Sequence, residues 1–305
     1  MPTVRFNSDI SDDQRRAALY SGELFVYSPI PASLAFIAFA REIISSAFPG
    51  LDPETAQYEM PVEEYARRLA ELKPIFIHHR ESKRHVRNIV EALGCDSSET
   101  YFEVPKMRSS TSDGYLTAGI AYAWHPHRDT WYSAPPCQIN WWIPIFELIP
   151  GNAMAFHPRY WSEPINNSSA GYNYYEWNAQ HRGGHLIQYI KEDPRPLPKA
   201  TQSIELDPLI ELNCPPGGVI LFSAAQLHSS MPNNSGRTRF SIDFRTANRG
   251  DLKTREGAAN IDSACTGTAL REFVRAADLE PLPEDIVTMY EDGTESRGAA
   301  VYKPK

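Results

Sequence analysis

A change of hydrophobic period near residue 100 limits the folds open to this chain of 305 residues. Before that point apolar residues recur at the spacing of amphipathic helices, over 11–48, from Pro61 onward and from Glu81 to Leu93. After it they alternate with polar residues, as in half-buried strands. Helices first and strands second predict a mainly β barrel or sandwich with a helical N-terminal layer.

Six segments after this change are predicted to be strands, because Gly, Pro, Asn and Ser separate them. They are 101–105, 115–123, 137–146, 153–156, 219–222 and 238–246. In the segment 137–146, Gln138 and Asn140 fall on one face and the isoleucines on the other. Polar side chains are costly to bury without partners, so this pair either faces solvent or lines a site.

The length and the 42% apolar content suit one large domain, 1–305. We divide it into a helical N-terminal layer at 1–98, a barrel core at 99–157 and 201–250, an insertion at 158–200 and a C-terminal extension at 251–305. The insertion is long for a loop and rich in Tyr and Trp, which favours a functional lid over disorder. A structural insertion packed on the barrel exterior is the alternative.

Composition excludes several classes of partner. The formal charge of −8, without a run of Lys or Arg, offers no surface for nucleic acid or an anionic membrane. No apolar run approaches the roughly 20 residues of a membrane span, and the N-terminus has no apolar signal core. The four cysteines lie far apart with no C-x-x-C pair, as expected for reduced thiols. We therefore expect a soluble, cytoplasmic protein.

The candidate metal ligands lie in the string His125-Pro-His127-Arg-Asp129, which follows the strand predicted at 115–123. In an extended chain, alternate side chains point to one face, so these three could converge. A further histidine, His228, ends the strand-like block 217–228. A His-x-Asp pair with a distant His is the composition of the two-histidine, one-carboxylate triad that holds iron(II) and leaves one side of the ion open. These residues alone leave open which of His125 and His127 is the ligand.

Together with His127 and Asp129, the sequence around His228 resembles the phytanoyl-CoA dioxygenase-like branch of the iron(II)/2-oxoglutarate-dependent oxygenases. The matching features are Pro216-Gly217 before an apolar strand, His228 followed by Ser230, Pro232-Asn233 and Ser235, and Arg239 eleven residues after that histidine. The resemblance covers roughly residues 115–246. It implies a double-stranded β-helix, a jelly-roll, cupin-like core. It also implies that His127, Asp129 and His228 bind Fe(II), with His125 outside the ligand set.

The resemblance implies a dioxygenase that uses Fe(II), 2-oxoglutarate and O2 to oxidise a small molecule, with release of succinate and CO2. The outcome would be hydroxylation, desaturation or oxidative cyclisation. Arg239 holds the position that binds the distal carboxylate of 2-oxoglutarate, a task for a bidentate, permanently charged donor. Ser241 lies two residues on, on the same strand face, and would bond the same carboxylate. We expect Asn140 to contact 2-oxoglutarate or substrate.

Further substrate contacts are expected from residues near the metal string and in the insertion. They are Trp131, Tyr132, Arg159 and His185. With His181 and Arg182, the last two hint at a carboxylate or phosphate on the substrate, although such residues also suit exposed turns.

Two other function classes stay open. A cupin-type metal-dependent isomerase or a keto-acid-independent dioxygenase would use His125 and His127 together, but such cupins usually supply a Glu soon afterwards, and none follows before Glu147. A non-catalytic metal- or ligand-binding barrel would leave the Arg239-x-Ser241 pair without a purpose. Halogenating relatives have Gly or Ala in place of the carboxylate, so Asp129 argues against halogenation.

Overall fold

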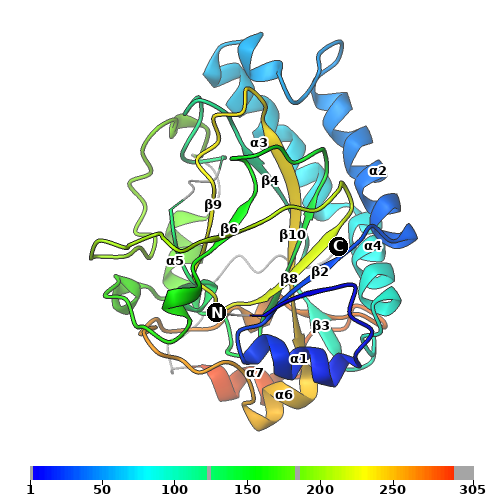
Figure 1. Ribbon diagram of the computed structural model, residues 1–305, viewed down its shortest axis with the longest axis vertical. Helices are drawn as coiled ribbons and strands as arrows, with labels where there is room; N and C mark the ends of the chain where they lie inside the picture. Colours follow the sequence, from blue (N-terminus) through cyan, green and yellow to red (C-terminus); the bar gives the residue numbers. More distant parts are fainter. Residues whose placement is uncertain (1–2, 122–124, 183–185, 292–305) are drawn as a thin grey trace.

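The computed structural model describes residues 3–121, 125–182 and 186–291, and its centre consists of two β-sheets (Figure 1). The large sheet has eight strands in the order β1-β2-β8-β5-β10-β3-β11, with β4 also paired to β10, and the small sheet has the order β7-β6-β9. The strands are β1 Val4–Phe6, β2 Leu24–Tyr27, β3 Thr100–Phe102, β4 Lys106–Ser110, β5 Ile139–Pro144, β6 Met154–Phe156, β7 Ile210–Leu212, β8 Val219–Ser223, β9 His228–Ser230, β10 Arg239–Asn248 and β11 Val274–Arg275. An apolar cluster that includes Trp142, Ile220 and Phe156 joins the two sheets.

The two faces of β10 have opposite character, and this difference places the site. Phe240, Ile242 and Phe244 point into the main apolar core. On the opposite face, Arg239, Asp243 and Arg245 line a small cavity. β10 pairs antiparallel with β5 along one edge and with β4 and then β3 along the other. The strand is therefore the middle of the large sheet and carries charged side chains into the interior.

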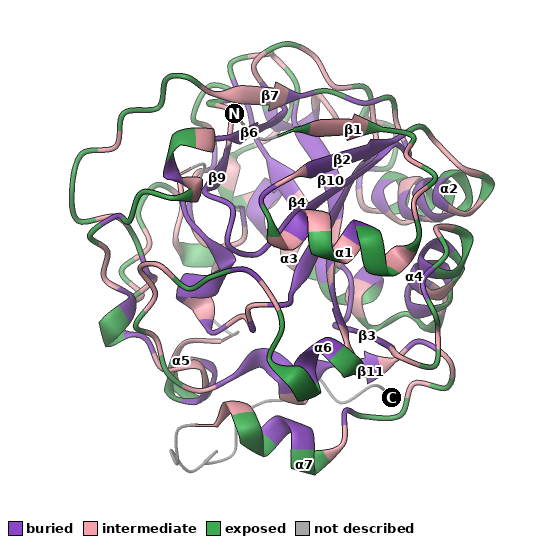
Figure 2. Cartoon of the chain, turned by 60° about the horizontal axis from the view of Figure 1, so that its bottom comes forward, coloured by how far each residue is buried: buried purple, intermediate pink, exposed green. Residues whose placement is uncertain are grey.

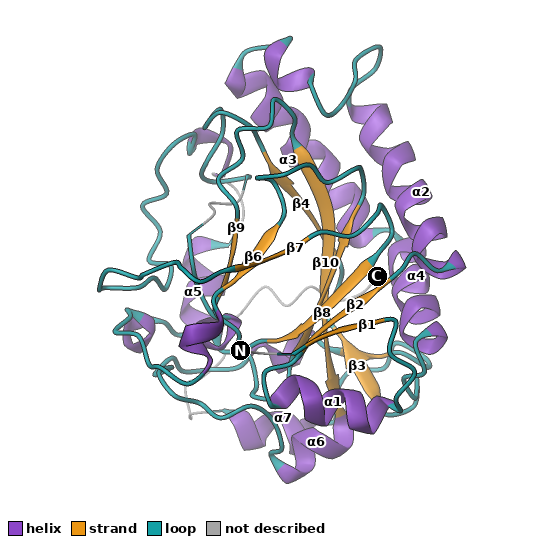
Figure 3. Cartoon of the chain, in the orientation of Figure 1, coloured by secondary structure: helices purple, strands orange, loops and turns teal. Residues whose placement is uncertain are grey.

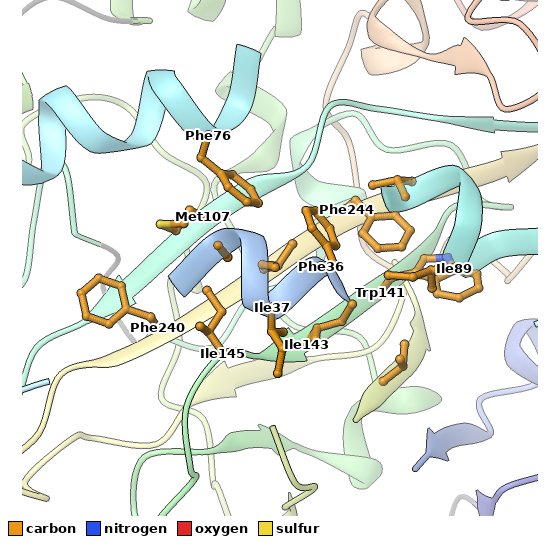
Figure 4. Packing of buried hydrophobic residues seen from close by; sticks show 14 of the residues in the cluster. Phe36, Ile37, Phe76, Ile89, Met107, Trp141, Ile143, Ile145, Phe240 and Phe244 are labelled. Carbon is orange, nitrogen blue, oxygen red and sulfur yellow. The ribbon is translucent and has the colours of Figure 1, made fainter. Parts of the chain in front are cut away.

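Three helices cover the outer face of the large sheet: α2 Pro31–Ala47, α3 Val62–His78 and α4 Arg80–Ala92. Figure 4 shows Phe36 and Ile37 of α2 packed over the β5 and β10 side chains. Figure 2 shows buried residues along the central strands and on parts of α2 and α4. The other helices are α1 Asp12–Tyr20, α5 Tyr174–His181, α6 Arg249–Thr254 and α7 Glu284–Val287, with short 3-10 turns between elements.

The helix signals in the sequence are confirmed for α3 and α4. The α3 helix begins after Pro61, with two glutamates in its first turn, and α4 is followed by Gly94 at φ +79°. His79 caps α4 by accepting a hydrogen bond from the Glu81 N–H at 3.2 Å. This histidine therefore has a structural role.

The helical run predicted over 11–48 is wrong in its middle. Gly22, at φ +96°, ends α1, and β2 follows before α2 begins. All four residues of β2 are buried, so the strand shows neither the helical period nor an alternation. With β1, it extends the large sheet beyond β8. The N-terminal part thus contains both strands and helices and is not a purely helical layer.

The strand predicted at 115–123 is wrong over its described part, 115–121, which consists of turns. Gly114 and Gly119 both have φ +62°, a conformation that an extended strand does not tolerate. A side chain at Gly119 would also collide with the carbonyl oxygens of Leu186 and Tyr189. Residues 122–124, which precede the string His125-Pro-His127-Arg-Asp129, lie outside the described residues.

The other predicted strands are confirmed as β3, β5, β6, β8 and β10. Their arrangement, a sheet-rich core with helices on one side, is compatible with the expected jelly roll. The segment between β6 and β7 runs on the side of the molecule away from α2 and α4, largely as loop (Figure 3). No described helix combines the length and apolar character needed to cross a membrane.

Candidate metal centre

Three buried side chains, His127, Asp129 and His228, bring their ligand atoms within 4.8 Å of one another. The Asp129 Oδ1 atom lies 3.5 Å from His127 Nε2 and 3.9 Å from His228 Nε2. The two imidazole ring centroids are 4.4 Å apart. Among the described residues, this is the group of His, Cys, Asp and Glu side chains that could hold a metal ion.

Backbone pairing brings the two histidines together across 101 positions of sequence. The N–H of His127 donates to the carbonyl of His228 at 3.0 Å, and the reverse bond has the same length. His228 begins β9, whereas Asp129 begins the 3-10 turn Asp129–Tyr132. The ligands therefore come from a bridge and a turn, and not from the one extended strand that the sequence suggested.

Both imidazoles are held with Nε2 facing the centre. The Nδ1 atom of His127 lies 3.1 Å from the carbonyl oxygen of His125, and that of His228 lies 3.0 Å from the carbonyl oxygen of Gln226. Because a carbonyl only accepts, each Nδ1 carries a proton, and in the neutral form of either ring Nε2 presents its lone pair to the centre. Burial, together with the charge of His127, lowers the pKa of His228 to about 3, so this ring is neutral at physiological pH.

The Asp129 carboxylate divides its two oxygens between the centre and the protein. Oδ1 faces the histidines, while Oδ2 accepts hydrogen bonds from Gln138 Nε2 at 3.4 Å and from Arg245 Nε at 3.3 Å. Burial alone would raise the pKa of Asp129, but the charge of Arg245 and the histidine contacts hold it well below the usual range. The group is therefore an anion with one oxygen directed at a metal.

His125 lies outside this group. Its ring centroid is 5.6 Å from that of His127, and it lines the larger of two cavities described below. Burial lowers its pKa to about 4. A metal site that used His125 and His127 as a pair, as a cupin-type isomerase would, does not match this arrangement.

A small cavity of about 70 Å³ adjoins the three ligands and contains Arg239. The described residues that line it include Asn140, Trp142, Met154, Phe222 and Ser230. Arg239 is 6% exposed and donates to the Asn152 carbonyl at 2.7 Å and to Ser230 Oγ at 2.8 Å. No carboxylate of the described residues lies within ion-pairing distance of it. Burial lowers the pKa of Arg239 to about 10, which leaves a charged guanidinium inside the protein.

Ser230, and not Ser241, provides the hydroxyl beside this arginine. The Ser241 Oγ atom is buried, has no hydrogen-bond partner among the described residues and does not line the small cavity. Ser230 was missed as a site residue, although it stands two positions after His228 and therefore shares its strand face. A contact between Ser241 and the co-substrate stays a prediction.

A second, larger cavity of about 990 Å³ meets the small one at Arg108, Asp129 and Arg245, which line both. Its walls include α3, β4 and residues of the stretches 172–182 and 186–206. The insertion predicted at 158–200 thus supplies much of one wall. Whether it opens and closes as a lid stays a prediction.

The remaining predicted site residues divide between cavity and scaffold. Tyr132 lines the large cavity, packs edge-on against His127 and donates to the Pro198 carbonyl at 2.9 Å. Asn140 lines the small cavity, where its Oδ1 accepts from Gln138 at 2.9 Å.

Two of the residues predicted to contact substrate have partners away from the two cavities. Trp131 is fully buried beside Leu227 and donates to Asp262 at 2.8 Å. Arg159 lies at the surface in ion pairs with Glu163 and Glu205. Neither residue lines the small or the large cavity. His185 lies outside the described residues.

No protein-family model matches this sequence, and no curated protein matches it either. Among solved structures, the chain is similar to EvdO2 from Micromonospora carbonacea var. aurantiaca, with 14% identity and a TM-score of 0.44 over 81% of this chain and 94% of that one. It is also similar to SnoN, a non-heme α-ketoglutarate-dependent epimerase from nogalamycin biosynthesis, with 13% identity and a TM-score of 0.40 over 78% of this chain and 84% of that one. AviO1 from Streptomyces viridochromogenes Tue57 matches with 14% identity and a TM-score of 0.38 over 76% and 95% of the two chains. Values this low assign neither a family nor a reaction to this chain.

Proposed function

We propose that this chain is an Fe(II)- and 2-oxoglutarate-dependent dioxygenase of a small molecule, with a double-stranded β-helix core like that of the phytanoyl-CoA dioxygenase-like family. One observation carries the proposal: a His/Asp/His group and a buried, uncompensated arginine line the same small cavity. Two neutral imidazoles and one carboxylate suit Fe(II) and leave part of its coordination shell open. A guanidinium without a carboxylate partner suits one end of a dicarboxylate.

The residues have separate tasks in this proposal. His127, Asp129 and His228 hold the iron, and Arg239 with Ser230 binds the distal carboxylate of 2-oxoglutarate. Asn140 contacts the co-substrate from the same cavity. Gln138 and Arg245 fix the second oxygen of the aspartate, so that its first oxygen stays directed at the metal. When bound, iron supplies oxidative decarboxylation of 2-oxoglutarate by O2 to succinate and CO2, coupled to oxidation of the substrate.

The substrate occupies the large cavity in this proposal. That cavity shares Asp129 and Arg245 with the small one, so a molecule in it reaches the metal side of the site without entering the co-substrate pocket. Hydroxylation, desaturation and oxidative cyclisation all begin with such placement of one substrate C–H bond beside the metal. We propose an anionic substrate, for which the lining of the cavity gives a specific reason below.

An anaerobic titration of the apoprotein tests the proposed function. Adding Fe(II) and then 2-oxoglutarate should produce the weak visible charge-transfer band of a chelated keto acid. Succinate, which has both carboxylates but no keto group, is the matched control and should give no band. If iron is bound and 2-oxoglutarate gives no band, the protein is not an oxygenase of this class.

A further inference from the structure

The large cavity has a charge opposite to that of the chain. The whole sequence carries a formal charge of −8, yet eight Lys and Arg side chains line this cavity against three carboxylates. A concave surface lined by one sign of charge attracts ligands of the other sign. The excess of positive charge in the cavity therefore favours an anionic ligand. This holds only if at least one of these cations has no carboxylate partner within the protein.

Five of the eight cations that line the cavity are paired with carboxylates of the protein. Lys106 lies 3.0 Å from Glu103, and Arg245 contacts Glu103, Asp129 and Asp243. Arg108 pairs with Asp243 at 2.9 Å. These side chains have their counter-charges in place. Arg195 and Arg182 also have carboxylate partners, Asp193 and Glu272.

Lys73 differs from them. It is 8% exposed, lies on α3 in the cavity wall, and no carboxylate of the described residues lies within ion-pairing distance of its ammonium. One of its three N–H donors goes to the backbone carbonyl of Ile120. Burial, with a smaller contribution from the charge of Arg108 and against the opposing charge of Asp243, lowers the pKa of Lys73 to about 7. A buried cation without a counter-ion is unfavourable, and a ligand anion would remove that cost.

The rest of the wall is largely apolar. Helix α3 contributes Pro74 and Ile77, and the insertion contributes Trp177, Ile187 and Leu197. The volume of about 990 Å³ is at the upper end of the range for pockets that enclose a drug-sized molecule, about 300–1,000 Å³. A small inorganic anion would leave most of this surface uncovered.

We propose that the large cavity binds an amphipathic acid, with an apolar or aromatic body and one carboxylate, sulfonate or phosphate group that Lys73 binds. This inference rests on the proposed function only in taking that ligand to be the oxygenase substrate. The binding itself needs neither iron nor 2-oxoglutarate.

Two fluorescent probes with nearly the same skeleton test the proposal on the full chain without metal. One is 1-anilinonaphthalene-8-sulfonate, and the other is N-phenyl-1-naphthylamine, which lacks the sulfonate. Wild-type protein should bind the sulfonate at least about tenfold more tightly, and Lys73→Met should reduce this preference to less than about threefold. Lys191→Met is the matched control, because Lys191 lines the same cavity but is exposed, and it should keep the preference.

Two further variants test where the probes bind and whether the charge of Lys73 is responsible. Ala70→Phe places a ring in the cavity from the same helix and should weaken both probes, which shows that they bind there. Lys73→Gln keeps a donor for the Ile120 carbonyl without the charge, and serves if Lys73→Met does not fold. Equal affinity of wild type for both probes, or an unchanged preference in the Lys73 variants, would overturn the proposal. If wild-type protein prefers the sulfonate but gives no charge-transfer band with Fe(II) and 2-oxoglutarate, the proposed oxygenase function is refuted. The proposed binding site for an acid is then still supported.

Discussion

Replacing Arg239 with leucine should abolish tight binding of 2-oxoglutarate while leaving the metal in place. The guanidinium is 6% exposed, and its described partners are neutral oxygens: the carbonyls of Asn152 and Ala153 and the hydroxyl of Ser230. A carboxylate bound beside it would gain its only strong counter-charge from this residue. In Arg239→Leu that carboxylate would be buried without a partner.

The loss should be large because it includes the cost of the unpaired carboxylate. Truncating one member of a buried charge pair costs about 2 to 5 kcal/mol, which is a rise in Kd of roughly thirtyfold to several thousandfold. The near-complete burial of Arg239 places the expectation in the upper part of that range. Arg239→Lys keeps the charge but not the bidentate geometry, and should lie between wild type and leucine.

Arg237→Leu is the matched control, since Arg237 stands two residues earlier and differs mainly in burial. Its side chain is 49% exposed and lies 3.4 Å from Glu54. Such surface pairs contribute little, so its Kd for 2-oxoglutarate should change by less than about threefold. Anaerobic titration of both variants with 2-oxoglutarate, after Fe(II) affinity and thermal unfolding are measured, gives the comparison. A larger effect at Arg237 than at Arg239 would refute the assignment of the carboxylate site.

Three further outcomes are expected. Asp129→Ala should abolish substrate-dependent succinate formation and weaken Fe(II) binding, because the site loses its one anionic ligand, whereas His125→Ala should be much milder; equal metal loss in both would show that the ligand set is wrong. If residues 158–200 close over substrate, limited proteolysis there should be slower in the anaerobic complex with Fe(II), 2-oxoglutarate and substrate than in the apoprotein, and identical cleavage would favour a fixed structural insertion. Folding lowers the pKa of Lys73 from its ordinary value to about 7. Above pH 7 the folded state therefore binds fewer protons than the unfolded state, so the free-energy cost of burying Lys73 declines as pH rises. Lys73→Met should therefore stabilise the protein most near pH 7 and below, with the gain shrinking by up to about 1.4 kcal/mol per pH unit toward pH 10, and denaturant unfolding that shows the same gain at both pH values would contradict this.

The sequence predicted those elements whose two faces differ. β5 and β10 alternate between apolar residues that meet the helices and polar residues that meet the site, so their period was visible. β2 was not, because four buried residues in succession carry no period. The segment 115–121 failed for another reason: its alternation was real, but two glycines with positive φ turn the chain.

Sequence spacing identified the ligand types better than their geometry. His127, Asp129 and His228 do converge, but through a backbone bridge and a 3-10 turn rather than along one strand. The spacing of Arg237 and Arg239 does not show which of them is enclosed. The structure shows that Arg239 is buried and Arg237 is exposed. Lys73 left a signal that was overlooked: it interrupts the apolar stripe of α3 between Leu72 and Phe76, where a charged side chain needs a reason to be buried.

The inner face of β10 distributes charge so that the two anionic groups of the proposed site do not compete. Arg245 is engaged by Glu103, Asp243 and Oδ2 of Asp129, and Asp243 is in turn engaged by Arg108. Arg239, at the other end of the same face, has no carboxylate within ion-pairing distance among the described residues. A dicarboxylate that enters the small cavity therefore finds its free counter-charge at Arg239, and Asp129 keeps the neighbour that holds it ionised. The spacing of six residues along one strand thus separates the group that binds the co-substrate from the group that orients the metal ligand.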